Sequence, residues 1–99
     1  MTSAETVTSR ATALRALQEI PGIGTSIARD LYVLGMRKPT DLRCKSPEAL
    51  YAHSNRLAGV QQDRCLLYTF RCAVYYASRR RHDPEKLKWW NWSDSNLSS

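Results

Sequence analysis

The sequence predicts an all-α domain in which two pairs of helices are each joined by a short hairpin. The first observation is Pro-Gly-Ile-Gly at 21–24, which separates two runs with apolar residues at helical spacing. The second is Gly-Val-Gln at 59–61, which repeats the outline of that segment farther along the chain. The third is the stretch 62–79, whose apolar residues recur at steps of three and four, the pattern of a helix with one buried face.

Length and composition indicate one small, basic domain. The 99 residues are 42% hydrophobic and include three Trp and five Tyr, which is typical of a globular protein. We expect a single domain over 8–94, with disordered ends over 1–7 and 95–99, because both ends are small and polar. The net charge of +6 and the pI of about 9.6 favour an anionic partner, either nucleic acid or an acidic surface, over a protein that is merely basic.

The cysteines and the apolar segments bear on the cellular compartment. No stretch approaches the length of a membrane span, and the N-terminus lacks the basic and apolar regions of a secretory signal. The three cysteines are odd in number and form no Cys-x-x-Cys motif, which fits reduced thiols. We therefore expect a cytoplasmic protein with no membrane partner.

Metal binding and catalysis have little support in the sequence. Cys65 and Cys72 lie about 10 Å apart along one predicted helix, too far to ligate the same ion. Cys44 with His53 remains a weaker alternative. No nucleophile motif is found, and a domain of this size leaves little room for a deep catalytic pocket. We expect a protein that is not an enzyme and holds neither a metal nor another cofactor.

An N-terminal helix is predicted to lead into the first hairpin. It is expected to begin at residue 8 or 9 and to end at 19, because Leu14 and Leu17 lead into Ile20 at helical spacing. Pro21 then stops the helix, since its ring fixes φ and disfavours a helical residue before it.

The hairpin itself is predicted to form a phosphate site. Gly22 and Gly24 can adopt positive φ angles and let another backbone approach closely, and Ile23 between them is expected in the core. Thr25 or Ser26 is expected to cap the following helix. The first amides of that helix have no partners within it, and its dipole favours anions. The residues expected to contact a phosphate backbone are Gly22, Ile23, Gly24, Thr25, Ser26 and Arg29.

The middle of the chain predicts two helices joined by a charged linker. The first is expected over 25–34, with Gly35 as the residue that follows it. The linker is expected to contain one helical turn at 41–43. The next helix has Ser46 as its N-cap and Pro47 as its first residue. Its predicted inner face is Leu50, Tyr51 and Leu57.

The second hairpin is predicted to be a degenerate copy of the first. Gln61 adds a side chain where close approach is needed, so we expect this hairpin to be structural rather than phosphate-binding. The long helix after it, over 62–79, is expected to bury Leu66, Leu67, Phe70, Ala73, Val74 and Ala77.

A second stripe on the long helix alternates cations with aromatic rings. Its members are Arg64, Tyr68, Arg71, Tyr75 and Arg79. One interpretation is a secondary nucleic-acid face, on which the rings stack on unpaired bases. The favoured interpretation is that Tyr68 and Tyr75 receive the C-terminal tryptophans while the arginines stay in solvent.

The C-terminal tail is expected to pack back on the domain. Asp83 and Pro84 are typical of an N-cap and a first helical residue, so one or two helical turns should follow. Trp89, Trp90 and Trp92 carry a large apolar surface, and we expect at least two of them to contact the domain.

Two stretches resemble known proteins. Residues 20–35, with Ile-Pro-Gly-Ile-Gly, Ile-Ala-Arg-Asp-Leu and Leu-Gly, resemble the helix-hairpin-helix core. Residues 63–75 and the tail at 83–92 resemble the small bacterial pathogenicity-locus family, whose members are stand-alone helix-hairpin-helix proteins of about this length. The resemblance covers 17–94, and the Trp-rich ending is its most specific part. It implies a compact, SAM-like all-α fold and a DNA-binding role, and it brings no known reaction.

The resemblance also implies which residues touch DNA. By similarity to helix-hairpin-helix proteins, these are Gly22, Ile23, Gly24 and Thr25. Many such hairpins have a Lys just after the second glycine, and Thr25 and Ser26 replace it here, which removes cations from the site. We expect non-specific, non-catalytic DNA binding through the hairpin at 21–24. The alternative is a protein-interaction module of the same fold, with a protein partner or self-association and no nucleic-acid role.

Overall fold

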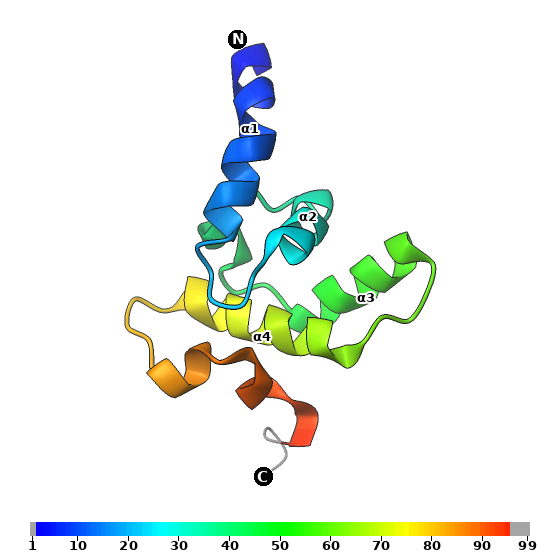
Figure 1. The fold of residues 1–99 in the computed structure, drawn as a ribbon, viewed down its shortest axis with the longest axis vertical. Coiled ribbons are helices and arrows are strands. Elements are labelled where there is room, and N and C mark those ends of the chain that lie inside the picture. Colours follow the sequence, from blue (N-terminus) through cyan, green and yellow to red (C-terminus); the bar gives the residue numbers. More distant parts are fainter. Residues whose placement is uncertain (1, 96–99) are drawn as a thin grey trace.

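The architecture is a bundle of α-helices and short 3₁₀ helices (Figure 1). This computed structural model describes residues 2–95, with side chains from Arg10 onward. Within that range no strand is present, so the predicted all-α class is confirmed. The α-helices are α1 (Thr2–Leu17), α2 (Thr25–Val33), α3 (Pro47–Ala58) and α4 (Arg64–Ser78), and the 3₁₀ helices are η1 (Pro39–Leu42), η2 (Pro84–Leu87) and η3 (Trp89–Trp92).

The bounds of the first helix differ from the prediction. Helix α1 begins at Thr2 and ends at Leu17, so the predicted start at residue 8 or 9 and the predicted end at 19 are wrong. The segment 2–7, expected to be disordered, is helical and projects from the bundle in Figure 1. Of the ends predicted to be disordered, residues 1 and 96–99 lie outside the described residues, whereas Ser95 lies within them.

Side-chain caps fix where the later helices begin. The hydroxyl of Ser46 accepts a hydrogen bond from the amide of Ala49 at 3.1 Å, which confirms the predicted start of α3. The carboxylate of Asp63 accepts from the amide of Cys65 at 2.8 Å, so α4 begins at Arg64 rather than at residue 62. Asp83 likewise caps η2, as predicted.

The core lies where α1, α2, α3 and α4 meet. Ile23 is only 5% exposed, which confirms that the first hairpin inserts a side chain into the core. Leu67, Phe70 and Ala73 of α4 are buried as predicted. Other core side chains are Leu17, Ile20, Ala28, Leu31, Met36, Leu42, Leu50 and Tyr51, and the half-buried Leu66, Val74 and Ala77 pack against them.

The last turn of α3 departs from the predicted inner face. Leu57 is 55% exposed, because this turn extends past the core and lies beside the equally exposed Val33 of α2. In the sequence, the spacing of Leu57 from Leu50 and Tyr51 indicates the same helix face. The packing partner that would cover this turn is absent from the described part of the chain, so the prediction for Leu57 is wrong.

The connection between α3 and α4 is held by polar groups. Gly59 ends α3 with a φ of +74°, and Val60 is 61% exposed, unlike Ile23 in the first hairpin. The Tyr51 hydroxyl donates to the carbonyl of Gln62, and the Gln62 amide donates to Asn55 Oδ1 at 2.9 Å. These bonds replace the apolar anchor that Ile23 supplies to the first hairpin.

Candidate nucleic-acid interface

The first hairpin is a tight turn whose apolar residue is buried and whose glycines are exposed. Gly22 has a φ of +86°, a conformation that favours glycine, and the Ile23 amide donates to the Ile20 carbonyl at 3.1 Å. Gly24 has φ −93° and ψ −172°, so of the two glycines that can adopt positive φ only Gly22 does so. The burial of Ile23 fixes the turn, and its two glycines therefore face solvent.

The N-terminus of α2 leaves several amides open. Gly24 is the N-cap residue, so the prediction that Thr25 or Ser26 caps this helix is wrong. A glycine has no side chain to accept from the first amides, and no side-chain cap is present. The first intrahelical bond runs from the Ala28 amide to the Gly24 carbonyl at 2.9 Å. Among the described residues, no acceptor faces the amides of Thr25, Ser26 or Ile27.

The predicted phosphate-contacting residues are exposed, apart from the buried Ile23, and two of them, Gly22 and Ser26, also line a neighbouring groove. Gly22, Gly24, Thr25 and Ser26 are exposed at the turn and the first turn of α2. Arg29 is exposed one turn further on, and the ion pairs of the described residues do not include it. The hairpin therefore offers open amides, two hydroxyls and one cation within a single helical turn.

An acidic groove of about 370 Å³ borders the hairpin on its other side. It lies between α2, the start of α4 and the tail, and its lining includes Gly22, Ser26, Asp30, Asp63 and Trp89. Burial raises the pKa of Asp30, whereas the hydrogen bond from the Cys65 amide lowers the pKa of Asp63. Two carboxylates on this flank disfavour a phosphate there, so an anion meets the hairpin more favourably from the Thr25 and Arg29 side.

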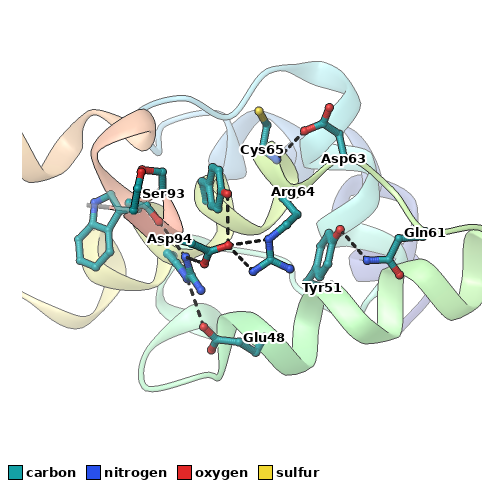
Figure 2. A network of polar contacts seen from close by, with 12 residues as sticks. Glu48, Tyr51, Gln61, Asp63, Arg64, Cys65, Ser93 and Asp94 are labelled. Carbon is teal, nitrogen blue, oxygen red and sulfur yellow. Dashed lines mark hydrogen bonds and ion pairs between the residues drawn. The ribbon is translucent and has the colours of Figure 1, made fainter. Parts of the chain in front are cut away.

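The second predicted face is largely occupied by the tail (Figure 2). Asp94 binds Arg64 Nε at 2.7 Å and Arg71 Nη1 at 2.9 Å, and it accepts from the Tyr68 hydroxyl at 3.3 Å. Arg71 also binds Glu48 at 3.2 Å. Hydrogen bonds from Arg71 and Arg64 lower the pKa of Asp94. The first three members of the predicted stripe therefore hold the tail in place at Asp94.

The remaining two members lie at the other end of α4. The ring of Tyr75 contacts that of Trp92, with centroids 5.4 Å apart, as expected for Tyr75. Tyr68 binds Asp94 instead, and the expectation that the arginines stay in solvent is wrong for Arg71, whose side chain is 10% exposed and paired with Asp94. Trp89 packs on Gly22, where an added Cβ would lie 3.2 Å from its ring. Trp90 is 54% exposed, so two of the three tryptophans pack back, as predicted. Arg79 is exposed, with its guanidinium 5.7 Å from the centre of the Tyr75 ring.

The three cysteines occupy different environments. Cys44 and Cys65 are exposed, and Cys72 is buried, where desolvation raises the pKa of its thiol to about 11. A hydrogen bond with Asp63 raises the pKa of the Cys65 thiol as well. Neither of these two thiols has the lowered pKa of a reactive cysteine. Over residues 2–95, no three His, Cys, Asp or Glu side chains are grouped so that they could hold a metal ion.

Two contacts of the site were missed in the sequence. The pairing of Asp94 with Arg64 and Arg71 joins residues more than 20 positions apart, so no helical spacing predicts it. In the sequence, the one indication is a carboxylate just after the tryptophans. The contact of Trp89 with Gly22 joins segments far apart in the sequence, which no local pattern predicts. Both contacts depend on how the tail folds along α4, as Figure 1 shows.

The fold and the site define a small all-helical protein with a buried-isoleucine hairpin and an uncapped helix N-terminus. The chain belongs to the pathogenicity locus family, Cdd1, whose family model matches residues 10–97. The match confirms the family resemblance seen in the sequence. No curated protein and no solved structure gave a significant match. In the described part of the chain, every helix is too short or too polar to cross a bilayer.

Proposed function

We propose that the protein binds DNA without sequence specificity, through phosphates at the first hairpin. The observation that carries the proposal is the glycine at position 24. Its φ of −93° is accessible to any residue, and an added Cβ would meet no atom within 4 Å. The fold therefore does not require glycine at this position. A glycine does keep the amides of Thr25 and Ser26 open to close approach by another molecule.

The proposed unit is a helix-hairpin-helix formed by α1, residues 18–24 and α2. The buried Ile23 supports it, because this side chain anchors a turn between two helices. We interpret α3, its connection and α4 as a second, degenerate unit of a SAM-like bundle. Gly59 with positive φ supports this interpretation, whereas the exposed Val60 and the side chain of Gln61 make phosphate binding there unfavourable.

The proposed contacts are those of a helix N-terminus with an anion. The amides of Gly24, Thr25 and Ser26 donate to phosphate oxygens, the two hydroxyls add hydrogen bonds, and Arg29 adds a charge. Contacts of this kind position a backbone and do not read bases. With few phosphates engaged, we expect a dissociation constant of about 10⁻⁴ to 10⁻⁶ M and affinity that falls as salt rises.

The proposed role is binding without catalysis and without a cofactor, in the cytoplasm. The features that support it are open backbone amides and a net charge of +6, which are features of a binding surface. The raised pKa of Cys65 and Cys72 supports the non-catalytic interpretation, because a nucleophilic cysteine needs a thiolate.

Titration of labelled duplex and single-stranded DNA at low salt tests this proposal. Gly24→Trp should weaken duplex binding and leave the fold intact, because φ at this position suits any residue and an added Cβ meets no atom within 4 Å. Val60→Trp is the matched control, since it places the same ring on the exposed second connection. Failure of the wild type to bind DNA at high protein concentration and low salt would refute the proposal.

A protein-interaction role is the second candidate. Val33 and Leu57 are exposed and line a small groove of about 180 Å³ between α2 and α3, together with Leu34 and Ala58. Adjacent exposed apolar side chains are typical of interaction surfaces, and the occupant proposed here is a second copy of the chain. Size-exclusion chromatography at several concentrations tests it: Leu57→Asp should abolish any self-association, and a wild type that stays monomeric at high concentration excludes it.

A further inference from the structure

Two basic segments far apart in the sequence meet at the C-terminal end of α4. The amide of Cys44 donates to Ser78 Oγ at 3.0 Å, and Ser78 is the last residue of this helix. The contact places Arg43 and Lys45 next to the three consecutive arginines at 79–81. All five basic side chains are exposed.

None of these five charges is neutralised within the described residues. The salt bridges there involve other cations. Neighbouring carboxylates are already engaged, since Glu48 pairs with Arg71 at 3.2 Å and Glu85 pairs with Lys88 at 3.1 Å. Asp83 accepts from the amide of Glu85 at 3.0 Å and keeps its negative charge, one carboxylate beside five cations. The cluster therefore carries a local positive charge that is open to an anionic partner.

The backbone on both sides of the cluster is held in place. The amide of Lys45 donates to the carbonyl of the fully buried Leu42 at 3.1 Å. On the other side, the His82 ring stacks on Tyr76 with centroids 4.6 Å apart and binds the Tyr76 carbonyl at 2.8 Å. Because these anchors exist before binding, little ordering of the backbone is needed when a ligand arrives.

A groove of about 330 Å³ adjoins the cluster, and Arg79 lines it. Its other lining residues are Pro47, Glu48, Arg71, Val74, Tyr75, Ser78 and Trp92, and the carboxylate of Glu48 is paired with Arg71 at 3.2 Å. The Tyr75 hydroxyl accepts from the Asp83 amide at 2.8 Å, and Trp92 Nε1 donates to the Lys86 carbonyl at 2.8 Å. Because the polar atoms of both aromatic residues are satisfied, the groove offers mainly ring and apolar surface.

We infer that single-stranded nucleic acid binds the groove lined by Arg79, Tyr75 and Trp92, together with the exposed cations beside it, Arg43, Lys45, Arg80 and Arg81. The cations bind successive phosphates, and one unpaired base enters the groove beside Trp92. The inference deepens the proposed function and rests on nucleic acid being the partner. Ring surface beside unpaired cations favours a single strand over a duplex, because a duplex keeps its bases stacked inside.

Fluorescence anisotropy with labelled oligothymidylate at about 50 mM salt tests whether the basic side chains contribute to single-strand binding. The variant Arg79→Gln/Arg80→Gln/Arg81→Gln should bind at least about tenfold more weakly, and the slope of log affinity against log salt should become shallower by about 2. The matched control Arg10→Gln/Arg15→Gln/Arg56→Gln removes the same charge from exposed residues outside the cluster at the end of α4, and its affinity should fall by less than about threefold. Equal losses in the two variants would overturn the inference.

An abasic oligonucleotide of the same length tests the aromatic part without any change to the protein. If a base enters the groove, the wild type should bind oligothymidylate at least about fivefold more tightly than the abasic strand. Equal affinity for the two strands would overturn the base-binding part. Tighter binding of an acidic peptide of equal charge would overturn the assignment to nucleic acid.

A hairpin variant separates this inference from the proposed function. Gly24→Trp should weaken duplex binding more than it weakens oligothymidylate binding, whereas the triple arginine variant should show the reverse order. One outcome is that the wild type fails to bind duplex while the arginine variant still binds oligothymidylate more weakly than the wild type does. That result would support the groove inference and refute the hairpin proposal. If oligothymidylate binding depends on Gly24 and not on the arginines, the groove inference fails.

Discussion

A series of substitutions at Gly24 separates the stability of α2 from binding at its N-terminus. The added Cβ meets no atom within 4 Å and φ is −93°, so Ala, Asn and Asp all fit without strain. Asn and Asp accept from the amides of Ser26 or Ile27 and improve the cap by a few tenths of a kcal/mol over glycine. Asp gains about 0.3–1 kcal/mol more from the helix dipole. The melting temperature of Gly24→Asp should therefore rise by a few degrees.

The same substitutions should weaken DNA binding, because the cap takes the amides that the phosphate needs. The Asp carboxylate also repels a phosphate about 4 Å away by about 1 kcal/mol in a water-like dielectric, which is about a fivefold loss of affinity. The expected order of duplex affinity is Gly, then Ala, then Asn, then Asp, while Asn and Asp are the most stable variants. Calorimetry and duplex anisotropy measure the two properties. A stabilised Gly24→Asp that binds duplex as tightly as the wild type would refute phosphate binding at the hairpin.

Three further predictions test other parts of the structure. Asp94→Asn should lower the melting temperature at pH 7, because it removes the carboxylate that binds two arginines. The pKa of Asp94 is lowered in the folded state, so its contribution is present above its ordinary pKa of about 3.9 and is lost as pH falls below it. A difference between wild type and variant that does not shrink in acid would contradict this pairing. Cys72 should react with a thiol reagent only on unfolding, since it is buried with a pKa of about 11, whereas Cys44 should react in the native state; mass spectrometry counts the modified thiols. Cys44 has a φ of +58°, so Cys44→Gly should preserve or raise stability and Cys44→Val should lower it by about 1–2 kcal/mol in urea unfolding, and equal stability would exclude strain there.

Local patterns in the sequence were sufficient for most of the elements. The side chains of Ser46 and Asp83 each accept a hydrogen bond from an amide at the start of the following helix. Such a cap depends only on residues close together in the sequence, so the sequence predicts it. The burial of Ile23 followed from an apolar residue between two glycines in a tight turn. The N-terminal boundary failed, because nothing local in the polar segment 2–7 sets a helix start.

The candidate sites were less accessible to sequence reasoning. The composition of the hairpin was visible, but the identity of its cap depended on where the turn ended, and the cap is Gly24. The Arg–Tyr stripe was visible as a pattern, but whether it faced a ligand or the tail depended on Asp94. Exposure at Leu57 depended on how far α3 extends past its neighbours.

The sequence by itself determined the helical class, the position of the first hairpin, the caps of α3 and η2, and the net positive charge. Each of these depends on residues within a few positions of one another, where backbone sterics and hydrogen bonding act directly. Only the tertiary structure decided that Asp94 neutralises part of the stripe and that Trp89 packs against one side of Gly22. It alone brought Arg43 and Lys45 to the arginines at 79–81, through the bond between Cys44 and Ser78. Contacts between distant segments depend on how whole helices pack, and no local pattern encodes them.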